Sequence, residues 1–320
     1  MQQRIFTAGS LEVADWGLDF HELMLGDVLR MDAYKQAIFE AVKSGMVICE
    51  IGVGTGILSK WALEAGARVV YGIEINKGIL DVAIENLKEF GSGFVPLLGL
   101  SYDISLPEKV DVIISEILGN IADNENFSPI LQDAKNRFLK TDGEMLPLEV
   151  DSYFVPVCAE EAHQNILKRN IEPTHSDSLL INKMSKMEIS HLFNFYFDSI
   201  IPRSGYLAQP NILQHFDKNN LDEFYEKHLQ FKIVKGGNFT GFKGWFDAKL
   251  SQTVHLNIES EAQYSDSWKH AYFPVEKTIE VISDDIISVN FCRIEDNKYR
   301  WEGTVQRGGQ IIGNFNQKIL

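Results

Sequence analysis

Short apolar runs alternate with stretches of helical periodicity from residue 47 to about residue 147. Four of the apolar runs predict buried strands, at residues 47–51, 68–73, 94–98 and 110–115. The other stretches predict three helices and a turn, at residues 57–65, 79–89, 127–139 and 141–143. Strands separated by helices of this length predict a parallel, doubly wound, Rossmann-like sheet.

Beyond Pro147 the apolar residues recur at every second position, as in the segments 278–282 and 286–291. This period is typical of antiparallel strands. A polar run at 295–298 follows the second segment and predicts a hairpin turn. Residues 239–250 predict a further, aromatic-rich strand. We therefore expect the second half of the chain to form an antiparallel barrel or sandwich.

Two helical segments accompany these halves. One covers residues 20–43, ahead of the parallel sheet, and the other is an insertion at residues 160–205. Within the insertion, residues 186–199 are rich in Met, Leu and Phe, which suits either a core or a dimer contact; we expect a homodimer contact. The predicted domains are N-terminal helices (1–45), the parallel-sheet domain (46–147) and the antiparallel domain (148–320).

The 320-residue chain has a net charge of −15. A field of this sign repels phosphate backbones, so no nucleic acid partner is expected, and it attracts cationic substrates. Many acidic proteins carry such a charge for solubility alone. No apolar run has membrane-spanning length, and the first residues are not a signal segment. Three widely spaced cysteines favour a reducing, cytoplasmic location, and no metal site is expected.

The sequence Glu50-Ile-Gly-Val-Gly-Thr-Gly56 follows a predicted strand and opens a predicted helix. Its glycines, Gly52, Gly54 and Gly56, allow a tight turn and a close approach of the backbone to a ligand. A dinucleotide-binding loop would place its third glycine or alanine at position 57, which is Ile57 here. The spacing favours a cofactor without a pyrophosphate, and we expect S-adenosylmethionine.

Three side chains beyond the loop are candidates for the same cofactor. Glu74 ends the second predicted strand, where a carboxylate can accept hydrogen bonds from both ribose hydroxyls. Tyr102 and Asp103 follow the third strand, at the position expected for the edge of an adenine. Asp103 could accept from the adenine amino group, or it could be an ordinary loop acid.

The fourth strand leads into a segment with two glutamates, Glu116 and Glu125, nine positions apart. On one helix they would lie roughly 900° apart in rotation, on opposite faces. A loop that doubles back near Gly119 and Asn120 would instead bring them together. Neighbouring carboxylates are costly unless a cation lies between them. A guanidinium is suited to that place because it is planar, permanently charged and able to donate to both acids.

With these features the chain resembles the protein arginine methyltransferases. The resemblance runs from about residue 18 to the end and rests on residues 21–30, the glycine loop, Glu74, the two glutamates, and residues 139–147 and 264–270. It implies that His21 and Met24 lie against the cofactor and that Arg30 pairs with its methionine carboxylate. Glu116 and Glu125 would hold the substrate guanidinium. The antiparallel half would be the family's barrel, and residues 160–205 its dimerisation arm.

The resemblance also assigns Asp27 and Trp268 to the substrate site. The family usually has a Thr-His-Trp loop, whereas this chain has Asp-Ser ahead of Trp268. The histidine that would pair with Asp27 is therefore missing, and His270 is a candidate to replace it. Phe127 stands where enzymes that make asymmetric dimethylarginine often have Met, and its ring could restrict the pocket to one methyl group.

The expected reaction is in-line methyl transfer to a guanidinium nitrogen, most plausibly that of arginine in a protein or peptide. The aromatic motif that the family has ahead of His21 is missing, so a small guanidino metabolite or peptide natural product is an alternative substrate. A catalytically silent dimeric scaffold is the alternative from a different class.

Overall fold

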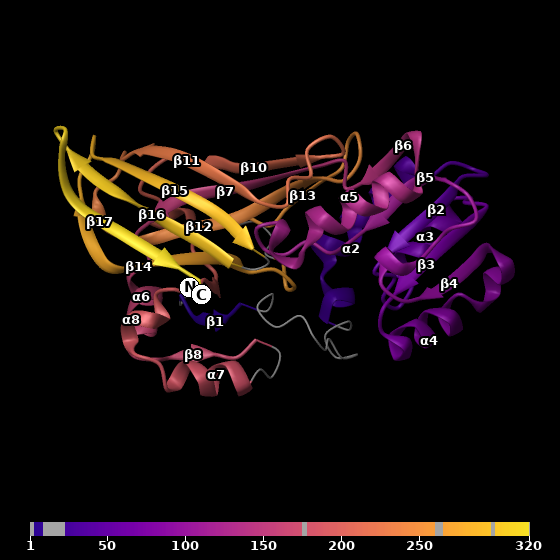
Figure 1. The fold of residues 1–320 in the computed structure, drawn as a ribbon, viewed down its shortest axis with the longest axis horizontal. Coiled ribbons are helices and arrows are strands. Elements are labelled where there is room, and N and C mark those ends of the chain that lie inside the picture. Colours follow the sequence, from indigo (N-terminus) through magenta and orange to yellow (C-terminus); the bar gives the residue numbers. More distant parts are fainter. Residues whose placement is uncertain (1–2, 9–22, 175–177, 260–264, 296–297, 320) are drawn as a thin grey trace.

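The computed structural model describes residues 3–8, 23–174, 178–259, 265–295 and 298–319. A parallel sheet with its helices lies at one end of an elongated molecule, and two antiparallel sheets lie at the other (Figure 1). Within the described residues, no helix combines the length and the apolar composition needed to cross a bilayer. The predicted fold class, a Rossmann-like half followed by an antiparallel half, is confirmed.

The parallel sheet has the strand order β4-β3-β2-β5-β6. Its strands are β2 (Val47–Ile51), β3 (Val69–Glu74), β4 (Phe94–Leu98), β5 (Val110–Ser115) and β6 (Leu139–Leu146). The helices that accompany it are α2 (Val28–Ala41), α3 (Ile57–Glu64), α4 (Lys77–Asn86) and α5 (Phe127–Phe138). β2 is buried along its whole length, as expected for a central strand covered on both faces. The carboxyl ends of β2, β3 and β5 meet at one edge, where the sequence placed the candidate cofactor residues.

Two local predictions in this half were wrong. The turn expected at residues 141–143 lies inside β6, where the strand bulges: Val110 pairs with Leu139, but Val112 pairs with Glu144. The helix expected over residues 20–43 is interrupted, because Asp27 is extended and caps α2 by accepting a hydrogen bond from a backbone N–H. Residues 23–26 form a separate helical turn before it.

The antiparallel half consists of two sheets packed face to face. One has the order β10-β7-β12-β14-β9-β1-β8, with β13 paired to β12, and the other has the order β11-β15-β16-β17. The strands of the first are β7 (Glu149–Val157), β10 (Asn211–Asp217), β12 (Gly237–Lys249), β13 (His255–Asn257), β14 (His270–Val281), β9 (Phe197–Ser199), β1 (Ile5–Thr7) and β8 (Ile171–Glu172). Those of the second are β11 (Tyr225–Lys232), β15 (Ile286–Glu295), β16 (Lys298–Arg307) and β17 (Gln310–Lys318). Aromatic rings join the sheets: Phe154 of β7 meets Phe291 of β15 edge-to-face at 5.1 Å.

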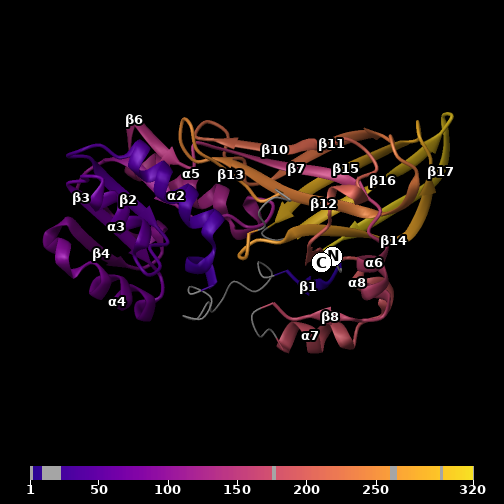
Figure 2. The same ribbon diagram turned by 180° about the vertical axis from the view of Figure 1, so that it is seen from behind.

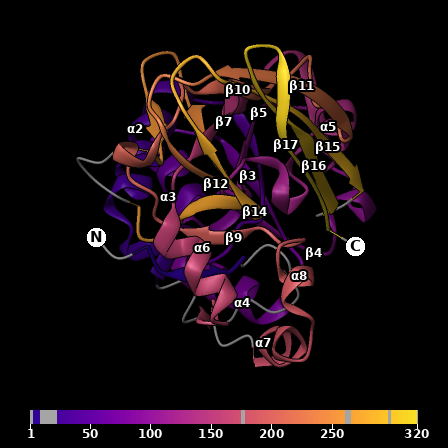
Figure 3. The same cartoon turned by 90° about the vertical axis from the view of Figure 1, so that its left-hand side faces the viewer.

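The insertion forms an arm beneath these sheets, made of α6 (Glu160–Leu167), α7 (Ser178–Ser185) and α8 (Ile189–Leu192) (Figures 2 and 3). β1, within the segment predicted as N-terminal helices, pairs with β8 and β9 of this arm. We had expected the apolar residues of 186–199 to form an exposed contact surface, but they do not. Four of them are buried within the single chain, namely Leu192, Phe193, Tyr196 and Phe197. Phe197 is buried because β9 is an internal strand, paired on both sides, and the other three residues pack into the hydrophobic core of the same chain.

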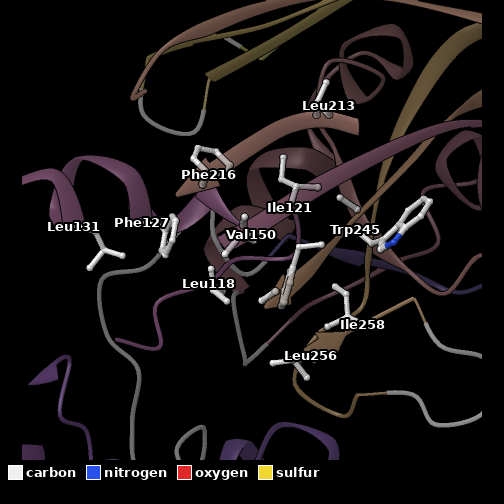
Figure 4. Close-up of a cluster of buried hydrophobic side chains, with 14 of the residues drawn as sticks. Leu118, Ile121, Phe127, Leu131, Val150, Leu213, Phe216, Trp245, Leu256 and Ile258 are labelled. Atoms are coloured by element: carbon white, nitrogen blue, oxygen red, sulfur yellow. The ribbon is translucent and has the colours of Figure 1, made fainter. Parts of the chain in front are cut away.

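A hydrophobic cluster connects the two halves (Figure 4). Leu118 and Ile121, from the loop after β5, point into it together with Phe127 of α5. Phe216 of β10 contributes from the antiparallel side, and its ring meets that of Phe127 edge-to-face at 5.8 Å. The loop that carries the two glutamates therefore lies on a packed surface of the second half.

Candidate active site

The glycine loop opens a cavity at the carboxyl edge of the parallel sheet. All three glycines have positive φ, and Gly56, with φ of 90°, starts α3. A Cβ atom at Gly56 would lie 2.8 Å from Cδ1 of Leu87, so this position has neither the conformation nor the space for a side chain. The loop thus presents bare backbone towards the cavity, as its sequence predicted.

The cavity has a volume of about 250 Å³. The residues predicted for the cofactor and substrate that line it are Met24, Arg30, Gly52, Gly54, Glu74 and Glu116. Tyr102 and Asp103 form a short 3-10 turn with exposed side chains and are not among its described lining residues. His21 lies outside the described residues. Gly56, Glu125, Asp27 and Trp268 are not among the described lining residues either, so the structure brings six of the thirteen predicted residues together around this cavity.

Glu74 is held by the loop that it faces. One of its carboxylate oxygens accepts a hydrogen bond from the Gly54 N–H at 3.0 Å, and the other accepts from the Asn76 N–H at 3.0 Å. Each oxygen has a second lone pair, and the residue lines the cavity. The carboxylate is thus fixed in orientation while it can still accept from two hydroxyl donors of a ligand.

Glu50 is a site residue that our sequence analysis missed. It is buried at the end of β2, lines the cavity and accepts a hydrogen bond from the Ser59 hydroxyl. Burial raises the pKa of Glu50 to about 8, while the hydrogen bonds from Ser59 oppose this rise. The signal was present in the sequence, because an acidic residue interrupts an otherwise apolar, fully buried strand.

The loop between the two glutamates doubles back sharply, as the nine-residue spacing suggested. The Gly119 N–H donates to the Ala122 carbonyl at 3.0 Å, and the Ala122 N–H donates to the Gly119 carbonyl at 2.9 Å. Asn124 closes the turn from within by accepting from the Ile121 N–H at 3.1 Å. A 3-10 turn, Asp123–Glu125, then leads into α5.

Arg30 carries a guanidinium that pairs with one glutamate and acts on the other through its charge. It forms a buried ion pair with Glu116, and its charge opposes the rise in the pKa of Glu125. Burial raises that pKa to about 7, and burial also lowers the pKa of Arg30 to about 10. The Arg30 guanidinium lies over the ring of Trp268, 5.4 Å from its centre. The chain itself thus supplies a guanidinium to Glu116, where we expected the guanidinium of a substrate.

The same arginine shows how the residues would fit S-adenosylmethionine. Its buried Nη1 atom has no hydrogen-bond partner among the described residues. A carboxylate in the cavity would give this atom an acceptor, while Glu74 would accept from hydroxyl groups elsewhere in the same cavity. A ligand with a carboxylate and a ribose matches this donor and acceptor set, as S-adenosylmethionine does.

Asp27 and Trp268, the residues predicted for the substrate site, lie on segments that the fold brings together. Asp27 accepts hydrogen bonds from the Ser265 hydroxyl and, at 3.0 Å, from the Ser267 N–H. The Trp268 ring N–H donates to the Leu118 carbonyl at 2.6 Å, which ties this segment to the glutamate loop.

His270 does not replace the missing loop histidine. Its Nδ1 atom accepts a hydrogen bond from the Ile201 N–H at 3.2 Å, inside the antiparallel half. Burial lowers the pKa of His270 to about 3, so the ring stays neutral. The hydroxyl of Ser265 fills the role next to Asp27 instead. The Phe127 ring likewise does not line the cavity, because it packs on Phe216 in the cluster between the two halves.

Comparisons with known proteins agree with this geometry. The family model of the ribosomal protein L11 methyltransferase (PrmA) matches residues 32–146, and that of the PRMT5 oligomerisation domain matches residues 149–307. A parallel sheet with this glycine loop and carboxylate, followed by the antiparallel half, defines an S-adenosylmethionine-dependent methyltransferase.

Curated relatives narrow the class. Protein arginine N-methyltransferase 5 of Xenopus laevis is 25% identical over 303 residues, which cover 88% of this chain and 46% of that protein. Protein arginine N-methyltransferase PRMT10 of Oryza sativa subsp. japonica is 26% identical over 305 residues, covering 86% of this chain and 80% of the relative. Both relatives are protein arginine N-methyltransferases, and the similarity to them extends over most of this chain.

Two solved structures share the fold. The protein arginine methyltransferase 10 of Arabidopsis thaliana superposes with a TM-score of 0.80 at 22% identity, covering 95% of this chain and 98% of that one. The PRMT1 enzyme-prozyme complex of Trypanosoma brucei with AdoHcy superposes with a TM-score of 0.78 at 20% identity, covering 94% and 98%.

Replacing the anchored carboxylate tests the cofactor site. Glu74→Ala should weaken binding of S-adenosylhomocysteine by ~1.5–3 kcal/mol, because it removes the acceptor for two hydroxyl donors. Titration calorimetry measures the change, with Glu85→Ala on the exposed face of α4 as the matched control. Unchanged affinity in Glu74→Ala would remove this residue from the site.

Proposed function

We propose that this chain transfers a methyl group from S-adenosylmethionine to a guanidinium nitrogen of arginine in a protein or peptide. The observation that carries the proposal is the guanidinium of Arg30 beside the cofactor cavity. Glu116 forms an ion pair with it, its charge acts on Glu125 of the same loop, and Trp268 lies against its face. This arrangement supports a site whose charges suit a planar cation.

Different residues around the cavity would bind different groups of the methyl donor. Glu74 would accept from the ribose hydroxyls, and the Nη1 atom of Arg30 would donate to the methionine carboxylate, with Met24 against the same ligand. When bound, the cofactor supplies a methyl group that is already activated on a sulfonium. The task left to the chain is to orient the accepting nitrogen, at a near-attack distance of ~3–3.5 Å.

The two glutamates would orient that nitrogen and draw the positive charge towards the rest of the guanidinium. As the new N–C bond forms and the S–C bond breaks, the nitrogen loses one proton, since arginine keeps its charge with a pKa above about 12. Glu125 is the suitable acceptor. Its raised pKa of about 7 lets the carboxylate take up a proton near neutral pH, which an ordinary glutamate does poorly.

Two other functions remain as outcomes of the experiments. A methyltransferase for a small guanidino compound would use the same clamp but would accept free guanidino compounds in preference to peptides. A silent scaffold would show no transfer to any acceptor. The intact glycine loop, Glu74 and both glutamates favour an enzyme over the scaffold.

We further propose that the enzyme acts as a homodimer in the cytoplasm. Support for the dimer comes from the match of residues 149–307 to an oligomerisation-domain model and from the projecting arm. Three unpaired cysteines, two of them buried, suit a reducing compartment. Light scattering on the intact protein should give twice the mass of one chain; a monomer at micromolar concentration would refute the dimer.

Neutral substitutions of the glutamates test the clamp. Glu116→Gln and Glu125→Gln keep size and hydrogen-bonding capacity but remove one charge each. Either change should lower turnover on an arginine peptide by ~10²-fold or more, because misplacement of the nucleophile by ~1 Å can cost that much. Calorimetry with S-adenosylhomocysteine should show nearly unchanged affinity. Glu144→Gln, at an exposed position of β6, is the control. Full turnover in either variant at saturating peptide would contradict the clamp.

The pH dependence tests the role of Glu125. Since burial raises its pKa to about 7, the carboxyl is protonated below that pH and loses the charge that faces the guanidinium. The kcat/KM for peptide should therefore rise with pH up to about 7 and then level off. In Glu125→Gln this dependence should disappear. A wild-type profile that is flat between about pH 5.5 and 8 would show that this group does not control the reaction.

A further inference from the structure

A buried ion pair connects the glutamate loop to the antiparallel half. Arg293 of β15 and Asp123 of the loop are both fully buried in their side chains, and the Nη1 atom of Arg293 lies 3.4 Å from an Asp123 carboxylate oxygen. Neither residue lines the cofactor cavity. No local pattern predicts this contact, since the two residues are 170 positions apart.

The Arg293 guanidinium also holds the residue on the other side of Glu125. Its Nη2 atom donates to the Asn126 side-chain oxygen at 2.9 Å, and its Nη1 atom donates to the Glu223 carbonyl at 2.8 Å. Asn126 has a left-handed backbone conformation, with φ of 60°, which a non-glycine residue adopts rarely. The planar guanidinium of Arg293 thus contacts Asp123 and Asn126, the residues at the two ends of the turn that contains Glu125.

The surroundings of Asp123 disfavour its charge, so the ion pair with Arg293 contributes little to the stability of the fold. Burial raises the pKa of Asp123 to about 6, while the Arg293 charge and the Tyr225 and Tyr299 hydroxyls oppose the rise. A buried ion pair of this kind usually stabilises a fold no better than well-packed apolar residues of the same volume. The pair does fix orientation, because the planar guanidinium of Arg293 holds its hydrogen-bond partners in a defined geometry.

The first half of the loop is also seated against the antiparallel sheet. The Ser152 hydroxyl of β7 donates to the Ile121 carbonyl at 2.8 Å. Gly244 of β12 lies so close that a Cβ atom there would be 2.7 Å from Cγ2 of Ile121. These contacts fix the turn at its tip, but they do not reach the residues around Glu125. Asn124, directly before Glu125, donates to the Asn120 side-chain oxygen at 2.8 Å and to the Tyr196 hydroxyl at 3.2 Å. Arg293 contacts the residues on either side of this pair, Asp123 and Asn126, and so adds a charged anchor to the same segment.

We propose that Arg293 is a positioning residue for methyl transfer: from the antiparallel half it sets the orientation of the Glu125 carboxylate through Asp123 and Asn126. The inference rests on the proposed function, in which Glu125 faces the substrate guanidinium. It assigns a catalytic consequence to a residue that touches neither the cofactor cavity nor the substrate clamp.

Three variants separate positioning from stability. Arg293→Met removes the fork but leaves Asp123 as an unpaired buried charge, so it also lowers stability. The double variant Asp123→Asn/Arg293→Met removes both charges and restores a neutral interior. The matched control is Asp285→Asn/Arg307→Met, which removes an arginine–aspartate pair at the β15 and β16 ends of the same sheet, without contact to the glutamate loop.

Four measurements are made on each full-length protein: the melting temperature, the affinity for S-adenosylhomocysteine, kcat on an arginine peptide, and amide hydrogen exchange of residues 116–126 in the presence of S-adenosylhomocysteine. In the double variant we expect a melting temperature near that of the wild type, unchanged affinity, tenfold or faster exchange of the loop, and kcat lowered by roughly 30- to 100-fold. The control pair should change neither loop exchange nor kcat.

The outcomes that overturn the proposal are distinct. If the double variant recovers wild-type kcat and loop exchange together with its melting temperature, the pair serves stability alone. Wild-type exchange in the double variant refutes positioning whatever its activity is. If the wild type methylates no arginine substrate, the proposed function fails, whereas faster loop exchange in the double variant would still show that Arg293 orders the segment around Glu125.

Discussion

Carboxylates at a buried edge of a sheet are costly unless a cation or a shared proton offsets their charge. In this protein the loop after β5 carries two of them, Glu116 and Glu125. Arg30 of α2 forms an ion pair with Glu116, its charge also opposes the rise in the pKa of Glu125, and Trp268 covers the face of its guanidinium. Arg30 and Glu116 also line the cofactor cavity, so the same ion pair lies next to the methyl donor and to the proposed acceptor site.

The sequence predicted those parts of the structure whose cause is local. Runs of apolar residues located the parallel strands, and the glycine spacing located the loop, because both follow from a few neighbouring positions. The nine-residue spacing of the glutamates predicted the turn between them. Burial of Phe197 was not predictable in this way, since it depends on β9 finding partners on two other strands.

The rest of the site depends on contacts between distant segments. Ser265 beside Asp27, and Arg293 beside Asp123, could not be found from periodicity, because neither residue type nor spacing marks them. His270 shows the opposite error: nearness in sequence to Trp268 suggested a role that its neutral, buried ring does not have. Glu50 was recognisable, as an acid within an apolar strand, but only burial shows that its proton is retained near neutral pH.

The contact between Asp27 and Ser265 spans 238 positions of the chain. A contact of that separation closes late, since a long loop must be ordered before the contact repays its entropy. The parallel sheet and its glycine loop require only the first half of the chain. A newly made chain can thus form the surface that binds the methyl donor well before the wall that faces the acceptor exists. Competence to react is therefore a property of the finished fold, because this part of the site joins segments from both ends of the chain.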